Sequence, residues 1–276
     1  MKKILLLTGA LLALTASLAL AAPGLDIKWS GATGASYCPL GAGNATDAAD
    51  PCDANDGAHN FSMAFKAPAG LTKVVSETFL VDVQTSAPVL PQWWHLEDRN
   101  DGLGIPAGCR GQDAGIAAPS SFSFNTSRSI GTTTLCKDYW AGAQSGTTVW
   151  NPGVGGPNRT RLYGVFARGS ASAGALTADQ EYYAGTGSFD TNHAIPDATT
   201  QPPTQLCDGC LLPACIVWNY LILQQPAGTP GGDATITTGN LFQFMTWQGG
   251  QVGGSGCPAA TPTKKATWGQ VKSLYR

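Results

Sequence analysis

The chain has 276 residues, of which 43% are hydrophobic and only 12% are charged, and it contains 35 glycines and 18 prolines. Its 16 basic and 18 acidic side chains give a formal net charge of −2, so the basic excess of a nucleic-acid-binding surface is missing and we expect no nucleic-acid partner. Neutral polar residues and turns are therefore expected to form most of the surface.

Residues 1–21 predict a signal peptide. Two lysines precede the apolar stretch ILLLTGALLALTASLALA, and Ala19 and Ala21 supply the small residues that a cleavage site needs. Polar interruptions and the following Pro23 argue against a retained membrane anchor. We expect cleavage after Ala21, no later transmembrane segment, and a secreted or cell-surface protein, with the periplasm as an alternative.

Short segments in which apolar and polar residues alternate with period 2 predict half-buried strands, because clusters of Gly, Pro or Asn bound them. Helical spacing of apolar residues is missing until the last fourteen residues. The pattern predicts an all-β fold of antiparallel sheets, most simply a β-sandwich. The expected strands are 25–29, 61–65, 79–83, 161–168, 181–190, 215–223, 234–238 and 241–247.

The segment CIVWNYLIL, residues 215–223, is apolar on both faces apart from Asn219, which predicts a central strand. Residues 84–160 and 191–206 fit the strand pattern poorly and are rich in Gly, Ser, Thr and Pro. Long connections in a compact domain are usually functional or cross-linked. We expect residues 22–248 to form one sandwich domain with long, disulfide-stapled loops.

Eight cysteines in an exported chain predict four disulfides, because the extracytoplasmic space is oxidising. The stretch CDGCLLPACIVW leaves two alternatives open. A redox motif is expected at the start of a helix, whereas this one leads into a strand. A zinc site would need further cysteine pairs or closely spaced histidines. Proximity in sequence suggests the pairs Cys38–Cys52 and Cys109–Cys136. Among the remaining four cysteines we favour Cys207–Cys215 and Cys210–Cys257.

The stretch DANDG and its echo DRNDG are candidate calcium sites, since carboxylate and amide oxygens are ligands for this ion. Both depart from the helical calcium loop, which has Gly at its sixth position and a late Glu. The alternative is a tight turn. No other cofactor is expected. The candidate calcium ligands are Asp53, Asn55, Asp56, Asp98, Asn100 and Asp101.

Aromatic residues in the long connections form a candidate platform on which a sugar ring or a peptide could stack. The alternative is that these rings fill the ends of the core, as large aromatic residues usually do. A glycan or another cell-envelope component is the expected partner of such a platform. The candidate residues are Trp93, Trp94, Tyr139, Trp140 and Trp150.

The sequence carries only weak signatures of a catalytic site. The nucleophile motif G-x-S-x-G is absent from the sequence. A glycosidase needs two carboxylates at a defined separation, which the sequence does not reveal. We therefore infer no catalysis and keep an extracellular hydrolase as an alternative. Its candidate groups are Glu97, Asp98, Asp101, Asp179 and Glu181, with His95 or His193 as a base.

The stretch 249–263 has the Gly- and Pro-rich composition of a linker, and it precedes a basic, amphipathic tail at 264–276. Such a tail can be a sorting or anchoring signal that a secretion machine or an anionic surface recognises. The alternative is a frayed chain end. The residues that would carry the signal are Lys264, Lys265, Trp268, Lys272, Tyr275 and Arg276.

The run ACIVWNYLILQQPAGTPGG, together with LPQWWHL, CKDYWAG and WGQVKSLYR, resembles a set of uncharacterised exported bacterial proteins. That resemblance implies export but no activity. More loosely, the strand series resembles sandwiches of the immunoglobulin, jelly-roll, cohesin and carbohydrate-binding types. Our interpretation is a secreted or cell-surface sandwich that acts by binding or as a structural envelope component. The alternatives are an adhesive or carbohydrate-binding module that uses the Trp-rich loops, and the hydrolase.

Overall fold

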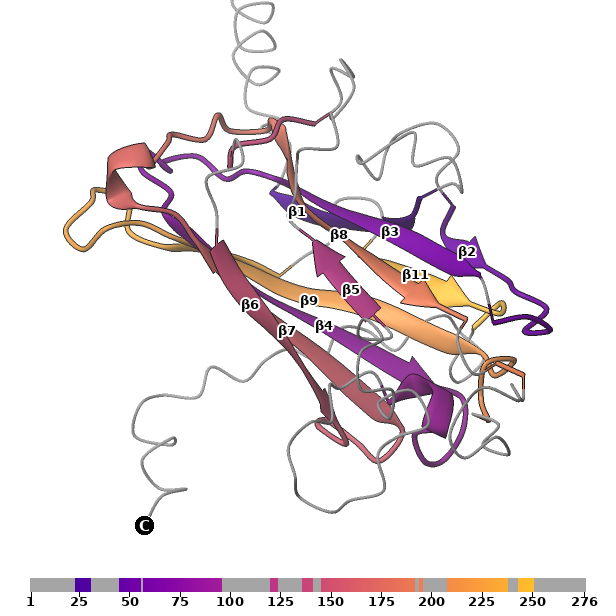
Figure 1. Ribbon diagram of the computed structural model, residues 1–276. Helices are drawn as coiled ribbons and strands as arrows, with labels where there is room; N and C mark the ends of the chain where they lie inside the picture. The colour runs from indigo at the N-terminus through magenta and orange to yellow at the C-terminus, as the bar shows by residue number, and fades with distance from the viewer. Residues whose placement is uncertain are drawn as a thin grey trace, which may run out of the picture.

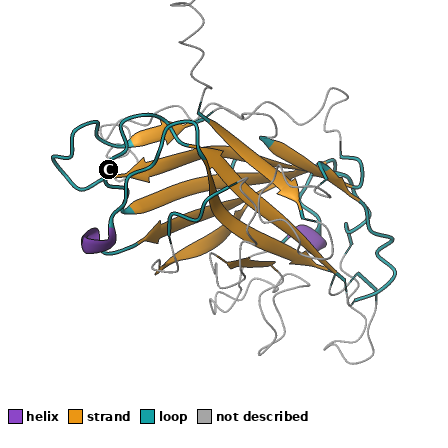
Figure 2. Cartoon of the chain, turned by 90° about the horizontal axis from the view of Figure 1, so that it is seen from above, coloured by secondary structure: helices purple, strands orange, loops and turns teal. Residues whose placement is uncertain are grey.

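The computed structural model describes residues 23–30, 45–55, 57–95, 120–123, 136–140, 145–191, 194–195, 208–237 and 243–250. Within these ranges the chain folds into two β-sheets packed against each other, which confirms the expected β-sandwich (Figure 1). The helical structure described is limited to two short 3₁₀ turns, η2 and η3, which lie at opposite ends of the sheets (Figure 2). No helix in the described ranges has the length and hydrophobicity that crossing a membrane requires.

The smaller sheet has the strand order β1-β3-β8-β5, and the larger has the order β2-β11-β9-β4-β7-β6 with β10 paired to β9 beside this path. All strand pairs in the described part of the chain are antiparallel except β2 with β11. The bounds are β1 Gly24–Trp29, β2 Asp47–Ala48, β3 Ala58–Lys66, β4 Ser76–Thr85, η2 Gln92–Trp94, β5 Ser120–Ser123, β6 Ser145–Pro152, β7 Arg159–Ala167, η3 Ser170–Ser172, β8 Glu181–Asp190, β9 Ala214–Gln224, β10 Ala234–Ile236 and β11 Phe244–Trp247.

The core lies between the sheets, where alternate residues of facing strands meet. In β4 the inward residues are Phe79, Val81 and Val83, all at most 1% exposed. They belong to the same buried cluster as Ile27 of β1 and Phe65 of β3. Removing this apolar surface from water is the main stabilising contribution to the fold.

Strand β9 confirms the predicted central position, since it pairs with β4 on one side and with β10 and β11 on the other. The register shifts between Leu80 and Val81 of β4, which pair with Tyr220 and Trp218 and leave Asn219 without a partner in the ladder. An extra residue of this kind is a β-bulge. The one polar residue of CIVWNYLIL therefore lies where the ladder is interrupted.

Two cross-strand pairs place a phenylalanine ring over a glycine. Gly164 of β7 lies opposite Phe79 of β4, and Gly187 of β8 lies opposite Phe61 of β3. A Cβ atom added at either glycine would lie 2.2 Å or 2.1 Å from the ring. Glycine is needed at these positions because the ring occupies the space of a side chain.

The sequence prediction missed β2, β5 and β6, of which β5 and β6 lie in the region expected to be a connection. It was also wrong to describe 61–65 and 79–83 as half-buried, because every residue in both segments is buried. On the outer face of β4, Leu80 and Asp82 are 5% exposed. Asp82 is covered there by the side chain of Arg161, which donates two hydrogen bonds to it at 2.6 and 2.8 Å.

Candidate functional site

The predicted aromatic platform is not exposed. Trp93, Trp94 and Trp140 are fully buried, and Tyr139 is 9% exposed. Trp150 is partly buried and packs against the core. These rings therefore fill the core, as the alternative interpretation held, and do not offer a surface for stacking a sugar.

Local structure explains why the paired tryptophans point inward. They lie in η2, where the backbone N–H of Trp93 donates to Asp208 O at 3.0 Å and the indole N–H of Trp94 donates to Gly209 O at 3.2 Å. The Trp93 ring stacks on Trp247 of β11 at 5.4 Å between centroids. A turn thus replaces the extended conformation in which neighbouring side chains would have faced opposite ways.

A disulfide joins Cys52 to Cys210, with 6.0 Å between their Cα atoms. The expected pairs Cys38–Cys52 and Cys210–Cys257 are therefore wrong. The two bonded cysteines are 158 residues apart in sequence. They come together because β11, which follows Cys210, pairs with both β9 and β2 and so brings the loop after β2 to the segment before β9.

Two further cysteines, Cys136 and Cys215, are also disulfide-bonded. Their expected partners, Cys109 and Cys207, lie outside the described residues, so these two pairings stay predictions. Among the cysteines that the structure describes, none is free.

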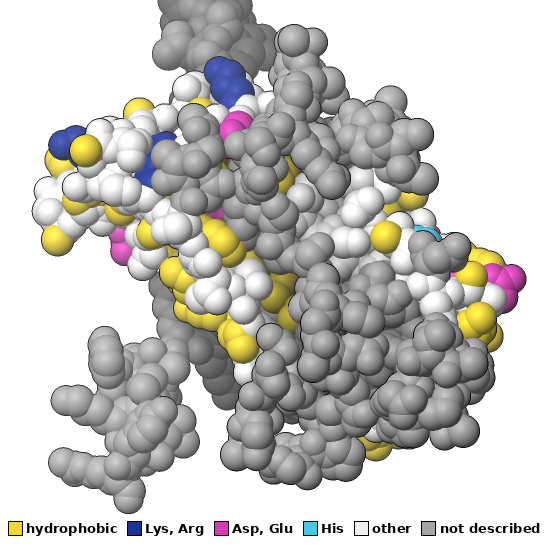
Figure 3. All heavy atoms as spheres, in the orientation of Figure 1, with side chains coloured by type: hydrophobic (Ala, Val, Ile, Leu, Met, Phe, Trp, Pro, Cys, Tyr) yellow, Lys and Arg dark blue, Asp and Glu magenta, His cyan; other side chains and the backbone are white. Residues whose placement is uncertain are grey.

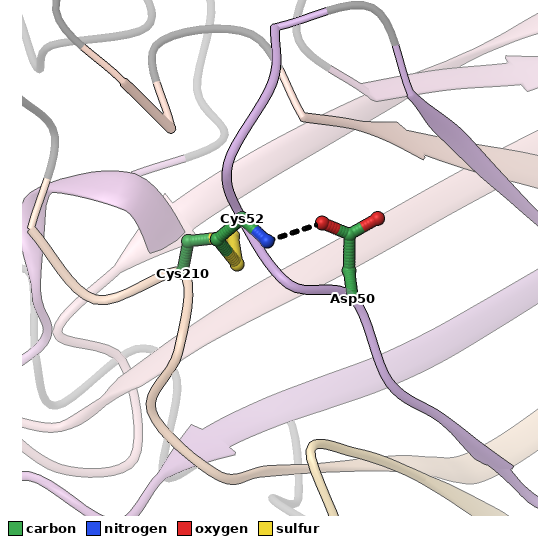
Figure 4. A group of neighbouring side chains, drawn as sticks. All are labelled: Asp50, Cys52 and Cys210. Atoms are coloured by element: carbon green, nitrogen blue, oxygen red, sulfur yellow. Dashed lines mark hydrogen bonds between the residues drawn. A yellow bond between two sulfur atoms is a disulfide. The ribbon is translucent and has the colours of Figure 1, made fainter.

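Asp50 holds the loop around this disulfide. Its Oδ1 atom accepts a hydrogen bond from the backbone N–H of Cys52 at 2.6 Å (Figure 4), and its Oδ2 atom lies 2.7 Å from Nε2 of His59. The His59 ring packs edge-on against Trp247 at 4.7 Å. Both partners of the Asp50–His59 pair are largely shielded from solvent, with side chains 17% and 23% exposed.

The ligand atoms of Asp50, Cys52 and Cys210 all lie within 4.8 Å of one another, a spacing that a metal site would have. Cysteine binds a metal as the thiolate. The two sulfur atoms are bonded to each other and the carboxylate is used by a backbone N–H (Figure 4). This group is therefore a cross-link with its local support, in agreement with the structural interpretation of the cysteines.

The candidate calcium residues are only partly described. Asp53 is exposed. Asn55 forms two hydrogen bonds with the backbone of Ile195. Its Nδ2 donates to Ile195 O and its Oδ1 accepts from Ile195 N, both at 3.0 Å. The other candidates, Asp56, Asp98, Asn100 and Asp101, lie outside the described residues. Calcium binding stays a prediction.

A group that the sequence analysis missed surrounds Glu77 of β4. Glu77 lies two residues before Phe79 and so shares its inward face, where it is completely buried. The hydroxyl of Tyr139 donates to its Oε2 atom at 2.5 Å. Burial raises the pKa of Glu77 from 4.5 to about 8, and the Tyr139 and Trp140 side chains only partly offset this. The carboxyl group is therefore mostly protonated at neutral pH.

Arg168 completes this group, which we call the Glu77 cluster (Glu77, Tyr139, Trp140 and Arg168). Its guanidinium donates to Tyr139 O and to Val74 O. It also lies over the Tyr139 and Trp140 rings, at 5.6 and 5.5 Å from their centroids. A cation over two ring faces adds attraction to the hydrogen bonds. The cluster fastens the segment that contains Tyr139 to β4 through Glu77 and to Arg168, the residue that follows β7.

Glu181 of β8 is a second buried acid with a raised pKa, at about 7. Burial is the main cause and the carboxylate of Asp26 adds to it, while Lys66 and Lys28 act in the opposite direction. Groups with shifted pKa values are common in active sites. Glu77 has no exposed surface, however, so it contacts no substrate in this conformation.

The other hydrolase candidates are scattered or undescribed. Asp179 lies in the turn before β8 with a positive φ of 63°, and His95 directly follows η2 as its C-cap. Glu97 and His193 lie outside the described residues, as do Asp98 and Asp101. The tail residues Lys264, Lys265, Trp268, Lys272, Tyr275 and Arg276 also lie outside them.

The chain has few detectable similarities to known proteins. No protein-family model matches the chain, and no curated protein matches it. Among solved structures, it is weakly similar to a cohesin module from a family 33 glycoside hydrolase of Clostridium perfringens. The identity is 8% and the TM-score 0.30, and the match covers 79% of this chain and 98% of that one. The cohesin-type resemblance therefore has only a loose structural counterpart.

Proposed function

We propose that this protein is a secreted or cell-surface β-sandwich that acts by binding or as a structural component of the cell envelope. The observation that carries the proposal is the outer face of the larger sheet, which exposes apolar side chains. Val149 of β6 is 48% exposed, Tyr163 of β7 36% and Phe244 of β11 42%. Val149 and Tyr163 are cross-strand neighbours and therefore project from the same face.

Export is supported by the disulfides, because such bonds form and persist in oxidising compartments.

A binding or structural role is supported by what the described polar side chains do, which is to hold segments of the fold together. Asp50 and His59 support a cross-linked loop, and Glu77 and Arg168 fasten one segment to the sheet. Interactions of this kind stabilise a scaffold.

The experiment is to express the full chain in a bacterial host, separate cytoplasm, envelope and medium, and alkylate the protein in each fraction. The proposal requires the protein in the envelope or medium, with no reactive thiols. A reduced protein confined to the cytoplasm would contradict it. A double variant, Val149→Lys with Tyr163→Lys, tests whether the exposed apolar face retains the protein on washed envelopes. Leu211→Lys is the matched control, because Leu211 is an exposed apolar residue in the turn before β9.

We further propose that the basic tail, residues 264–276, contributes to sorting or attachment. Its lysines and its apolar residues at helical spacing suit an anionic surface or a secretion machine. Deleting it is expected to release the protein into the medium or to retain it inside the cell. Unchanged export and unchanged surface retention would refute this role.

A further inference from the structure

Strand β6 is the edge strand of the larger sheet. One of its two edges has no partner strand in the described part of the chain. Its other edge pairs with β7 in a regular antiparallel register over all eight residues. Just beyond the strand, Gly153 N donates to Arg159 O at 2.7 Å, so these two residues form a hydrogen-bonded pair of the ladder. This bond shows which residues of β6 are bonded to β7. Because bonded pairs alternate along such a ladder, every second residue of β6 faces away from β7. The residues whose N–H and C=O groups point to the open edge are Gly146, Thr148 and Trp150.

Open edges invite pairing with another chain, and proteins usually block them with charges, bulges or proline. The sequence of β6, SGTTVWNP, contains no charged side chain, and its register with β7 shows no bulge. Thr147, Thr148 and Val149 are β-branched and favour extended backbone. Pro152 lacks an N–H donor but lies at the very end of the strand. Within the described residues, the edge thus lacks charges and bulges, and its one proline lies at the end of the strand.

We propose that β6 is an association edge through which two copies of this chain pair in antiparallel fashion, so that their larger sheets become one continuous sheet. This inference rests on the proposed function and names a second copy as the partner. The edge groups are arranged symmetrically about Thr148, so a two-fold axis there pairs each Thr148 with that of the second copy. Gly146 then lies opposite the second copy's Trp150 in both directions. Each residue in these pairs offers one N–H and one C=O, as a hydrogen-bonded pair requires.

Charge and size also suit a second copy. A symmetric seam brings identical residues close together, so a charged strand would repel itself, and β6 is neutral. Glycine opposite tryptophan leaves room for the larger ring. Hydrophobic side chains gather on the part of the surface where β6 lies (Figure 3). Val149 of β6 and its cross-strand neighbour Tyr163 of β7 are both exposed. Val149 would lie beside the second copy's Thr147. The apolar outer face would then continue across the interface between the two β6 strands.

The test uses the exported protein with its disulfides intact. Sedimentation equilibrium over a wide concentration range is expected to show a monomer–dimer equilibrium. Val149→Lys places two like charges near the axis and is expected to weaken dimerisation by about tenfold or more. Thr148→Pro removes the N–H donor at the axis without touching a hydrogen bond to β7. Phe244→Lys is the matched control, with the same charge change at a similarly exposed residue of β11, and it should leave the dissociation constant unchanged.

Circular dichroism and melting curves check that each variant is folded. Hydrogen exchange supplies a second readout, because the Thr148 amide should be protected in the wild type and exchange quickly in Val149→Lys. A wild-type protein that stays monomeric at all concentrations overturns the inference. A dimer that survives both β6 variants overturns it as well. If the monomeric protein is still exported and retained on envelopes, the proposed function stands and only the β6 edge is refuted.

Discussion

Replacing Glu77 with glutamine is expected to make the stability of this protein less dependent on pH. Glutamine has nearly the same shape and keeps an oxygen to accept the hydrogen bond from Tyr139, but it does not ionise. Glu77 has a pKa of about 8 in the folded protein and 4.5 as an ordinary carboxyl group. Between these values the unfolded chain has released a proton that the folded chain retains. The contribution of Glu77 to stability is therefore full below pH 4.5 and declines as the pH rises to about 8.

The magnitude follows from the size of the shift. One pKa unit corresponds to about 1.4 kcal/mol, so Glu77 lowers the free energy of unfolding by about 4 kcal/mol between about pH 4 and about pH 8. The variant lacks this decline. Relative to the wild type, Glu77→Gln should therefore gain about 4 kcal/mol over the same interval. Any constant packing change cancels in this comparison of two pH values.

The measurement is denaturant unfolding of both proteins, with disulfides intact, at several pH values in that interval. Glu181, whose pKa is raised to about 7, titrates in both proteins, so its contribution cancels in the difference. A difference between wild type and Glu77→Gln that stays constant with pH would refute the reasoning. Such a result would mean that Glu77 is not held protonated by burial. Glu77→Asp, which keeps the ionisable group, serves as a control and should retain the decline.

Three further outcomes are expected. Replacing Cys52 and Cys210 with alanine removes a cross-link between residues that are 158 apart in sequence. The free energy of unfolding, measured by denaturant titration, should fall by up to about 5 kcal/mol. Gly164→Ala should destabilise by about 1–3 kcal/mol, because its Cβ would lie 2.2 Å from the Phe79 ring, and an unchanged melting temperature would contradict this packing. Tyr139→Phe leaves Glu77 without its hydroxyl donor, so unfolding at neutral pH should cost about 1–3 kcal/mol less.

Much of the fold is predictable from local pattern. The segments 61–65, 79–83 and 215–223 were placed correctly because alternation and apolar character reflect the strand itself. Strand β6 was missed because its serine, glycine, asparagine and proline residues are typical of a turn. Its extended form depends on the ladder with β7, which follows it in sequence and covers its inner edge.

The candidate site was less predictable, because it depends on contacts between distant segments. The Cys52–Cys210 bond follows from strand order, which sequence proximity does not encode. The sequence left Trp93 and Trp94 between two interpretations, a loop surface and the core, and η2 turns both of them inward. Glu77 did carry a signal, because an acid two residues before Phe79 on a regular strand must share its inward face. Its importance becomes visible only with Tyr139 and Arg168 in place.

The Cys52–Cys210 bond also sets an order of events during biosynthesis. A chain emerges from the ribosome with its N-terminus first, so Cys52 becomes available while Cys210 is still 158 residues behind it. If Cys52 is oxidised in that interval, it joins a partner other than Cys210, and that bond must later be undone by thiol–disulfide exchange. Reaching the native state then requires either delayed oxidation or an isomerase. The yield of correctly bonded protein should thus depend on the host's oxidative folding machinery as much as on the stability of the sandwich.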